Sequence, residues 1–228
     1  MPTLTTSDPI IHQTPNSCTC GTANTIYLTG KQTCINLYDL AQLEPTHKED
    51  LLRSMISFAC TTIDSVGKQL ARDCLQEVID RDEGAQATFE KYISREINKE
   101  PHRILSRALS KTDYRGELIK AFTESIEGVS LQSFSQISEL CARFGIPTDS
   151  VLNQEDAKRI FDTRQKIVHE MDIETLTTPT GNIAQRRARA ESELKELTEK
   201  ILDSTQKLIQ TVHDKIHEPL APDAVGQS

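Results

Sequence analysis

Tryptophan is absent from this sequence, and aromatic residues make up only 4% of its 228 residues. A core of useful size must therefore be built mostly from aliphatic side chains. No apolar run approaches the roughly 20 residues that a membrane-spanning helix needs. The first residues also lack the basic and then apolar pattern of a secretory signal. We therefore expect a cytoplasmic protein that has no contact with a membrane.

An excess of basic residues is also missing, since 26 Lys and Arg stand against 34 Asp and Glu, which gives a net charge of −8. This balance excludes a surface that is basic throughout. A local basic cluster could still follow an RNA backbone. We predict this role for Arg186, Arg187 and Arg189 of "RRAR", at the start of a helix, and for Lys166. The alternative is that these residues only solvate a helix surface.

Six cysteines are present, and in the cytoplasm they are expected to be reduced. Three of them fall within helical patterns and are expected to be small core residues: Cys60, Cys74 and Cys141. Cys18, Cys20 and Cys34, together with His12, could supply four zinc ligands, but "CTC" is not the C-x2-C spacing of structural zinc sites. We therefore predict no metal or other cofactor. Residues 1–47 are expected to be an N-terminal extension, loosely structured or folded as a small hairpin.

From Lys48 onward, apolar residues recur at helical spacing. Eight of them step by three and four along the chain: Leu52, Ile56, Ala59, Ile63, Val66, Leu70, Cys74 and Val78. This pattern predicts a long amphipathic helix with one stripe that faces a partner. Further helices are expected over residues 89–97, from Pro101 toward Ser125, and over 131–147.

Two more helices are expected in the second half of the chain. Asn153 and Asp156 resemble a capping box, which predicts the start of one helix. After the turn "TTPTGN", a last long helix is expected from about Ile183 to His217. The whole pattern predicts an all-α fold, an antiparallel bundle with long first and last helices over residues 48–217. The tail, residues 218–228, is expected to be disordered.

The stretch "RQKIVHEMD", residues 164–172, carries the candidate chemistry. Arg164 lies at the edge of the apolar stripe of its helix, where a guanidinium needs a carboxylate or a phosphate as partner. His169 follows five residues later, about 140° around a regular helix, so the two side chains do not naturally converge. Either the helix end is distorted or two copies of the helix meet. We favour a composite site across a twofold axis.

An arginine and a histidine together are suited to metal-free RNA cleavage. The imidazole can take the proton from a ribose 2′-hydroxyl, and the guanidinium can bind the scissile phosphate. Glu170 and Asp172 flank the histidine and could favour its protonated form or fix its tautomer. The spacing by itself arises about once by chance in a chain of this composition. Lys166 and Glu170 could also form a simple ion pair on a solvated face.

This sequence resembles the HEPN superfamily (higher eukaryotes and prokaryotes nucleotide-binding domains), whose members share an R-x4-6-H motif. The resemblance rests on the motif, the long helix before it, the segment "LQSFSQISELCARFGI" and the long helix after it. The resemblance covers residues 48–217 and is to bacterial members of the RiboL-PSP kind. It implies a helical dimer whose two motifs face each other in a cleft. Many members are metal-independent endoribonucleases that act as toxins or antiviral-defence effectors and leave 2′,3′-cyclic phosphate ends.

The resemblance also implies roles for single residues. Arg164 would bind the phosphate and His169 would be the general acid or base. Gln165 stands where the family commonly has a smaller polar residue, often Asn, which puts a supporting role of Gln165 in doubt. An antitoxin or a defence-system protein would be a further partner, beside the RNA substrate and the second copy of the chain.

Two other functions remain open at this point. The first is a non-catalytic HEPN module that binds a nucleotide, RNA or a partner protein in the same cleft. The second is a helical adaptor that pairs through the last helix, whose leucines follow heptad-like spacing. Ser204 and Thr211 interrupt that seam, which disfavours a free-standing coiled coil.

Overall fold

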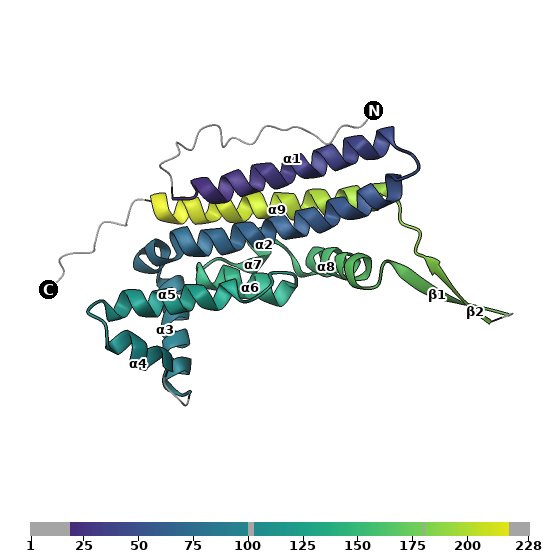
Figure 1. Cartoon of the computed structure of the whole chain (residues 1–228). Coiled ribbons are helices and arrows are strands. Elements are labelled where there is room, and N and C mark those ends of the chain that lie inside the picture. Colours follow the sequence, from purple (N-terminus) through teal and green to yellow (C-terminus); the bar gives the residue numbers. More distant parts are fainter. Residues whose placement is uncertain (1–18, 100–102, 180, 219–228) are drawn as a thin grey trace.

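Helices dominate the structure, a computed structural model that describes residues 19–99, 103–179 and 181–218 (Figure 1). The helices are α1 (Gly21–Leu43), α2 (Lys48–Arg81), α3 (Glu83–Ile97), α4 (Arg103–Leu109), α5 (Tyr114–Glu127), α6 (Phe134–Arg143), α7 (Thr148–Val151), α8 (Gln154–His169) and α9 (Glu191–His217). Between α8 and α9, the strands β1 (Ile173–Thr178) and β2 (Gly181–Arg186) form an antiparallel hairpin. The predicted all-α class is confirmed. Across the described ranges, no helix combines the length and the apolar character that a membrane span requires.

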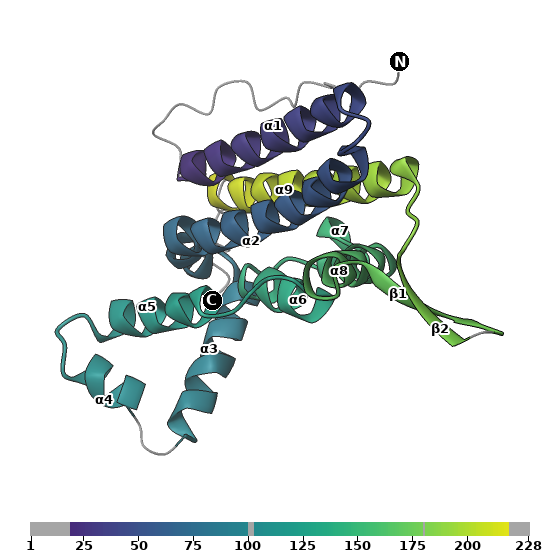
Figure 2. The same ribbon diagram turned by 45° about the vertical axis from the view of Figure 1, so that its right-hand side comes forward.

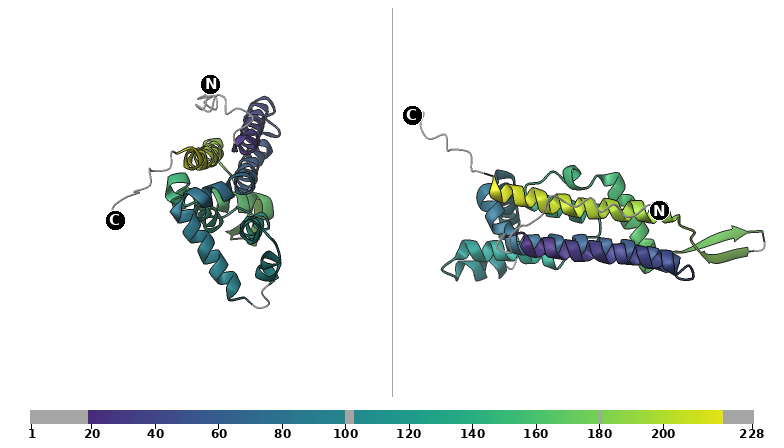
Figure 3. Two further views of the ribbon diagram at one scale, coloured as in Figure 1. Left: turned by 90° about the vertical axis from the view of Figure 1, so that its left-hand side faces the viewer. Right: turned by 90° about the horizontal axis from the view of Figure 1, so that it is seen from above.

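Helix α2 is the centre of the molecule. All eight apolar residues of the predicted stripe are buried, from Leu52 to Val78. A second set on the same helix is buried as well, including Met55, Leu75 and Ile79. Helix α2 therefore has neighbours on two sides, and not on the single side that the stripe predicted. Helices α1 and α9 cover one side of α2, and α5, α6 and α8 lie on the other (Figure 3).

The three long helices do not all alternate in direction. The short connection of residues 44–47 makes α1 antiparallel to α2. Helix α9 runs parallel to α2, because ion pairs join the matching ends of both helices. Lys48 Nζ lies 2.7 Å from Glu191 Oε2 at one end, and Lys215 pairs with Asp82 at the other. Helix α1, which the sequence analysis did not expect, is thus antiparallel to α2, whereas the long first and last helices of the predicted bundle, α2 and α9, run parallel.

The N-terminal segment corrects the sequence analysis, because residues 21–43 form a 23-residue helix and neither a loose extension nor a hairpin. Tyr27 and Cys34 are buried, and the hydroxyl of Tyr27 donates a hydrogen bond to Gln206 Oε1 on α9 at 3.0 Å. Burial, and to a lesser extent the charge of Asp203, raise the pKa of Tyr27 to about 12. The helical domain thus begins at Gly21. Residues 1–18 and the predicted tail from 219 onward lie outside the described residues.

The packing of α1 on α2 leads to a direct test at Gly30, where an added Cβ would lie 2.0 Å from Thr62 Oγ1. We expect Gly30→Leu to lower the free energy of unfolding by about 1–3 kcal/mol, because a side chain must force the two helices apart. Gly21→Ala is the control, since nothing lies within 4 Å of its Cβ. Urea unfolding measures both variants. Equal stability of the two would contradict the docking of α1.

Two other predicted helices also differ from the structure. The helix expected from Pro101 toward Ser125 is divided into α4 and α5, with Asp113 as the N-cap of α5. The last helix begins at Glu191 and not at Ile183, because residues 173–186 form the β-hairpin. The segment "TTPTGN" was correctly predicted as a turn, but it reverses a strand and does not start a helix.

Two of the three cysteines that raised the question of zinc, Cys20 and Cys34, are core residues. Cys20 and Cys34 are buried, and the thiol of Cys34 donates to the carbonyl of Met55 at 3.5 Å. Burial raises the pKa of Cys34 to about 12, which keeps the thiol protonated. In the part of the chain that the structure describes, no group of three His, Cys, Asp or Glu residues could hold a metal ion. Cys18 and His12 lie outside that part.

Candidate functional site

Helix α8 carries the motif and is closed at both ends by local interactions. Asn153 Oδ1 accepts a hydrogen bond from the backbone N–H of Asp156 at 2.9 Å, so the predicted cap is confirmed. The helix ends at His169, and the next turn contains two residues with positive φ, Met171 at 52° and Asp172 at 56°. Left-handed residues of this kind stop a helix and turn the chain sharply.

Arg164 and His169 meet in a single chain at the end of α8. Arg164 Nη1 lies 3.1 Å from His169 Nε2, within hydrogen-bond distance. Since a guanidinium can only donate, a hydrogen bond between these two atoms requires Nε2 as the acceptor. Arg164 is half-buried and His169 is exposed, so solvent reaches the pair. The expectation that an undistorted helix keeps the two apart is wrong, because the long arginine side chain reaches the ring.

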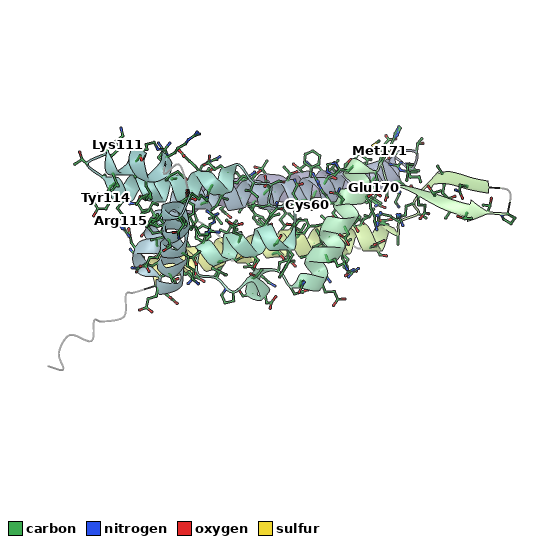
Figure 4. All side chains as sticks on the ribbon, turned by 90° about the horizontal axis from the view of Figure 1, so that it is seen from below. Cys60, Lys111, Tyr114, Arg115, Glu170 and Met171 are labelled. Carbon is green, nitrogen blue, oxygen red and sulfur yellow. The ribbon has the colours of Figure 1, made fainter. Side chains whose placement is uncertain are left out.

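Arg164 lies against the core on its other side. Burial raises the pKa of the Cys60 thiol on α2 to about 12, and the positive charge of Arg164 opposes part of this shift. Cys60 is therefore a protonated core residue and not a nucleophile. Its place midway along the molecule, away from the exposed turn with Glu170 and Met171, is visible in Figure 4.

The turn after His169 is held by a buried ion cluster, the Asp172 cluster, which consists of Asp172, Arg53, Arg187 and Arg189. The Asp172 side chain is 0% exposed. Arg189 binds it with two nitrogens at 2.9 Å, and Arg53 Nε donates to it at 2.9 Å. Arg53 Nη2 also donates to the carbonyl of Arg187 at 2.7 Å, and the N–H of Arg187 to the carbonyl of Asp172 at 2.7 Å.

The Asp172 cluster joins α2, the turn after α8 and the segment before α9. Burial raises the pKa of the Asp172 carboxyl, but hydrogen bonds from Arg189 and Arg53 outweigh burial and hold that pKa below its usual range. A carboxylate that is fully desolvated and charged is costly unless such partners surround it. Arg53 was not singled out in the sequence. Its position beside Leu52, at the border of an apolar stripe, was the available signal.

The arginines of "RRAR", which were predicted to bind RNA, form ion pairs with carboxylates of the protein. They lie at the end of β2 and after it, not on a helix as expected. Arg189 is only 7% exposed within the Asp172 cluster, and Arg187 Nη1 lies 3.2 Å from Glu174. Arg186 pairs with Asp50 of α2. Because carboxylates already bind these groups, a phosphate would have to displace them. Asp172 likewise faces the arginines and is not hydrogen-bonded to His169 in the described structure.

The remaining predicted residues surround the pair. Gln165 and Glu170 are exposed, and Lys166 is half-buried. The carbonyl of Lys166 accepts from the N–H groups of Glu170 and Asp172, at 3.1 and 2.8 Å, and so helps to close the helix. The described residues contain no ion pair between the Lys166 and Glu170 side chains, so the simple i, i+4 alternative is not what orders this face.

An apolar surface lies beside the pair and continues onto the hairpin. Val168 is 39% exposed and Met171 71%, directly around His169. On the hairpin, Leu176 pairs with Ile183 across the strands, and both side chains are exposed. The hairpin extends away from the helices (Figures 1 and 2). A two-stranded hairpin is only marginally stable in water by itself, and apolar side chains on such an arm are typical of a protein interface.

Comparisons of this chain with protein-family models, with curated protein sequences and with solved structures found no match. Its chemistry is therefore inferred from its own side chains. A solvent-accessible guanidinium next to an imidazole that can accept a proton could bind a phosphodiester and deprotonate a neighbouring hydroxyl.

Proposed function

We propose that the protein is a metal-independent endoribonuclease of the HEPN type, with Arg164 and His169 as its catalytic residues. The observation that carries this proposal is the 3.1 Å contact between Arg164 Nη1 and His169 Nε2 at a solvent-accessible helix end. Most of the arginines that the structure describes pair with a carboxylate, whereas this one faces an imidazole. A pair of this kind is suited to a substrate that brings both a negative charge and an ionisable hydroxyl, as RNA does.

The proposed reaction needs no group besides the RNA and the protein. A phosphate oxygen takes the place of His169 Nε2 as acceptor for Arg164. His169 accepts the proton of the 2′-hydroxyl while the 2′-oxygen attacks phosphorus. The bond from phosphorus to the 5′-oxygen breaks, and the proton held by the His169 imidazolium passes to this oxygen, which returns the imidazole to its neutral form. The products are a 2′,3′-cyclic phosphate and a 5′-hydroxyl end.

The experiment that tests this function is incubation of the purified protein with mixed cellular RNA in EDTA, beside His169→Ala. We expect cleavage by the wild type alone, with cyclic phosphate at the product ends. Cleavage that survives in His169→Ala would point to a contaminating nuclease. Should the folded wild type cut no RNA and cause no His169-dependent toxicity when expressed, the non-catalytic binding module would replace the nuclease as the better proposal.

We also propose that a second copy of the chain covers the apolar surface beside the pair. A homodimer would bring two Arg164–His169 pairs to one interface and shield Met171, Leu176 and Ile183 from water. A toxin or a defence effector held inactive by a partner protein is the biological setting that we propose for such an enzyme.

The dimer proposal predicts the effect of a charge on the hairpin. We expect Leu176→Asp to convert the dimer to a monomer, because a buried unpaired carboxylate costs several kcal/mol. Leu43→Asp is the control, since Leu43 is 76% exposed at the end of α1. Sedimentation equilibrium measures the mass of each variant. A monomeric wild type, or a dimer that survives in Leu176→Asp, would contradict this interface.

A further inference from the structure

Seven basic residues follow one another at intervals of four: Lys91, Arg95, Lys99, Arg103, Arg107, Lys111 and Arg115. This basic series runs through α3 and α4 to the start of α5. Residues four apart lie on one face of a helix, so Lys91 and Arg95 share a face of α3, and Arg103 and Arg107 share a face of α4. All seven side chains belong to exposed residues.

The segment that carries the basic series differs in charge from the rest of the chain. Residues 91–120 contain eight basic and four acidic residues, a net charge of +4 in a chain whose total is −8. The acidic side chains are partly engaged: Glu96 is buried and pairs with Lys99, and Asp113 caps α5 through the N–H of Gly116. Positive charge therefore predominates on this surface, which steers polyanions toward it.

Four members of the basic series have no carboxylate partner in the part of the chain that the structure describes. Within the described residues, no ion pair involves Lys91, Arg95, Arg103 or Lys111. The arginines before α9 are in the opposite situation, since Asp172, Glu174 and Asp50 bind them. The available phosphate-binding charge therefore lies on α3 to α5 and not on "RRAR".

Apolar and aromatic groups accompany this charge. Tyr114 is 57% exposed and Leu109 is 72% exposed, on either side of the connection between α4 and α5. Exposed aromatic rings among basic residues are what single-stranded nucleic acids use as stacking surfaces. Lys111, Tyr114 and Arg115 come together at one end of the molecule (Figure 4).

We propose that the basic series and Tyr114 form a second binding surface for single-stranded RNA, remote from the Arg164–His169 pair. Arg53 of α2 binds Asp172 beside the pair, and Asp80 of α2 binds Arg115, at 2.9 and 2.6 Å. These two positions are about 40 Å apart along the helix at 1.5 Å per residue. A stacked strand needs about 12 nucleotides to span that distance.

The inference rests on the proposed function for its substrate, but binding tests it independently of cleavage. The probes are fluorescent single-stranded RNAs of about 6 and about 20 nucleotides, in EDTA, with His169→Ala as the parent so that no cutting occurs. The variant Lys91→Gln/Arg103→Gln/Lys111→Gln removes three exposed charges from the series. The control, Lys31→Gln/Lys158→Gln/Lys207→Gln, removes the same charge from α1, α8 and α9.

We expect the series variant to bind the longer RNA at least tenfold more weakly than the parent, with a salt dependence lower by about 2 in logarithmic slope. Tyr114→Ala should also weaken this binding, because a base loses its stacking partner. The control variant should stay within about twofold of the parent. If the two triple variants lose RNA affinity equally, net charge explains the effect and the proposed binding surface is contradicted. Preference of the series for anionic lipid vesicles over RNA would overturn it as well.

The same variants with His169 restored separate this inference from the nuclease. If cleavage of the long RNA depends on His169 but is as fast in the series variant as in the wild type, the second surface is contradicted and the nuclease proposal stands. If RNA binding depends on the basic series but the wild type cleaves no RNA, the second surface stands and the nuclease proposal is contradicted. We expect the series variant to cleave the long RNA more slowly than the wild type does and the short RNA at the same rate, since the short RNA cannot reach both surfaces.

Discussion

Replacing His169 by alanine is expected to slow RNA cleavage by about 10²–10⁴-fold, the usual contribution of a general acid or base. The imidazole is the proposed proton acceptor at the end of α8, and its Nε2 already lies 3.1 Å from the proposed phosphate-binding nitrogen. Single-turnover cleavage of one defined RNA in EDTA measures the rate. A loss below tenfold would contradict the role of His169.

Arg164→Ala should cause a loss of similar size, because the guanidinium would stabilise the charge that develops on the phosphate. Arg164→Lys keeps the charge but not the planar fork, so it should recover only part of the rate. Two residues that act as one unit give effects that do not add. We therefore expect the double variant to cleave RNA about as slowly as the worse single variant.

His213→Ala is the matched control for these variants. His213 lies on α9, where Nδ1 is 3.4 Å from the Asp214 carboxylate, and it takes no part in the proposed site. Its removal should leave the rate unchanged. If His213→Ala slowed cleavage as much as His169→Ala, loss of folding and not loss of chemistry would explain both results.

Asp172→Ala is expected to lower the free energy of unfolding by about 3–5 kcal/mol, the usual cost of breaking a buried charge pair by removing one partner. Without the carboxylate, Arg53 and Arg189 would face each other across a desolvated space. These side chains are 3% and 7% exposed. The turn after His169 would lose its anchor too, so cleavage should weaken together with stability.

The pH dependence of this effect has a defined sign. The pKa of the Asp172 carboxyl lies below its usual value in the folded protein. Its contribution to stability is therefore complete above the ordinary aspartate pKa of about 4 and is lost as the pH falls through the lower, folded value. The difference in stability between wild type and Asp172→Ala should thus be constant near neutral pH and shrink in acid.

Urea unfolding at pH 7 and at lower pH measures this difference, with Asp162→Ala as the control. Asp162 is an exposed residue of α8, and its removal should change the stability by less than about 0.5 kcal/mol. A loss in Asp172→Ala no larger than in Asp162→Ala would mean that the cluster does not hold the turn. A difference that grows in acid would contradict the charge assigned to Asp172.

The helical character of this protein is readable from its sequence wherever one apolar stripe repeats. The eight apolar residues from Leu52 to Val78 have the period of a helix and are buried as predicted, and the apolar residues of α9 from Leu194 to Val212 are buried too. The cap at Asn153 and the placement of Arg164 and His169 on one helix follow from local rules in the same way. Such features depend on residues within one or two turns of each other, which is why a sequence pattern suffices.

Segments whose conformation depends on distant partners were predicted wrongly. Residues 21–43 are rich in Thr and other β-branched or polar residues, which reads as a strand or a loop, yet α2 and α9 bury Tyr27 and Cys34 as a helix face. Residues 173–186 have too little periodicity to indicate a hairpin. The Asp172 cluster holds the base of this hairpin, and one of its members, Arg53, lies more than 100 residues from Asp172 in the sequence.

The sequence by itself determined the class of fold, the stripes of the long helices and the candidate pair on α8. The tertiary structure alone decided that α1 belongs to the core, that the arginines before α9 bind carboxylates, and that Lys91, Arg95, Arg103 and Lys111 of the basic series form no ion pair within the described residues. The physical reason is the distance along the sequence over which each kind of interaction acts. Helical periodicity and capping act between near neighbours, whereas the partner of a charged side chain is set by which distant carboxylates the fold brings within about 4 Å.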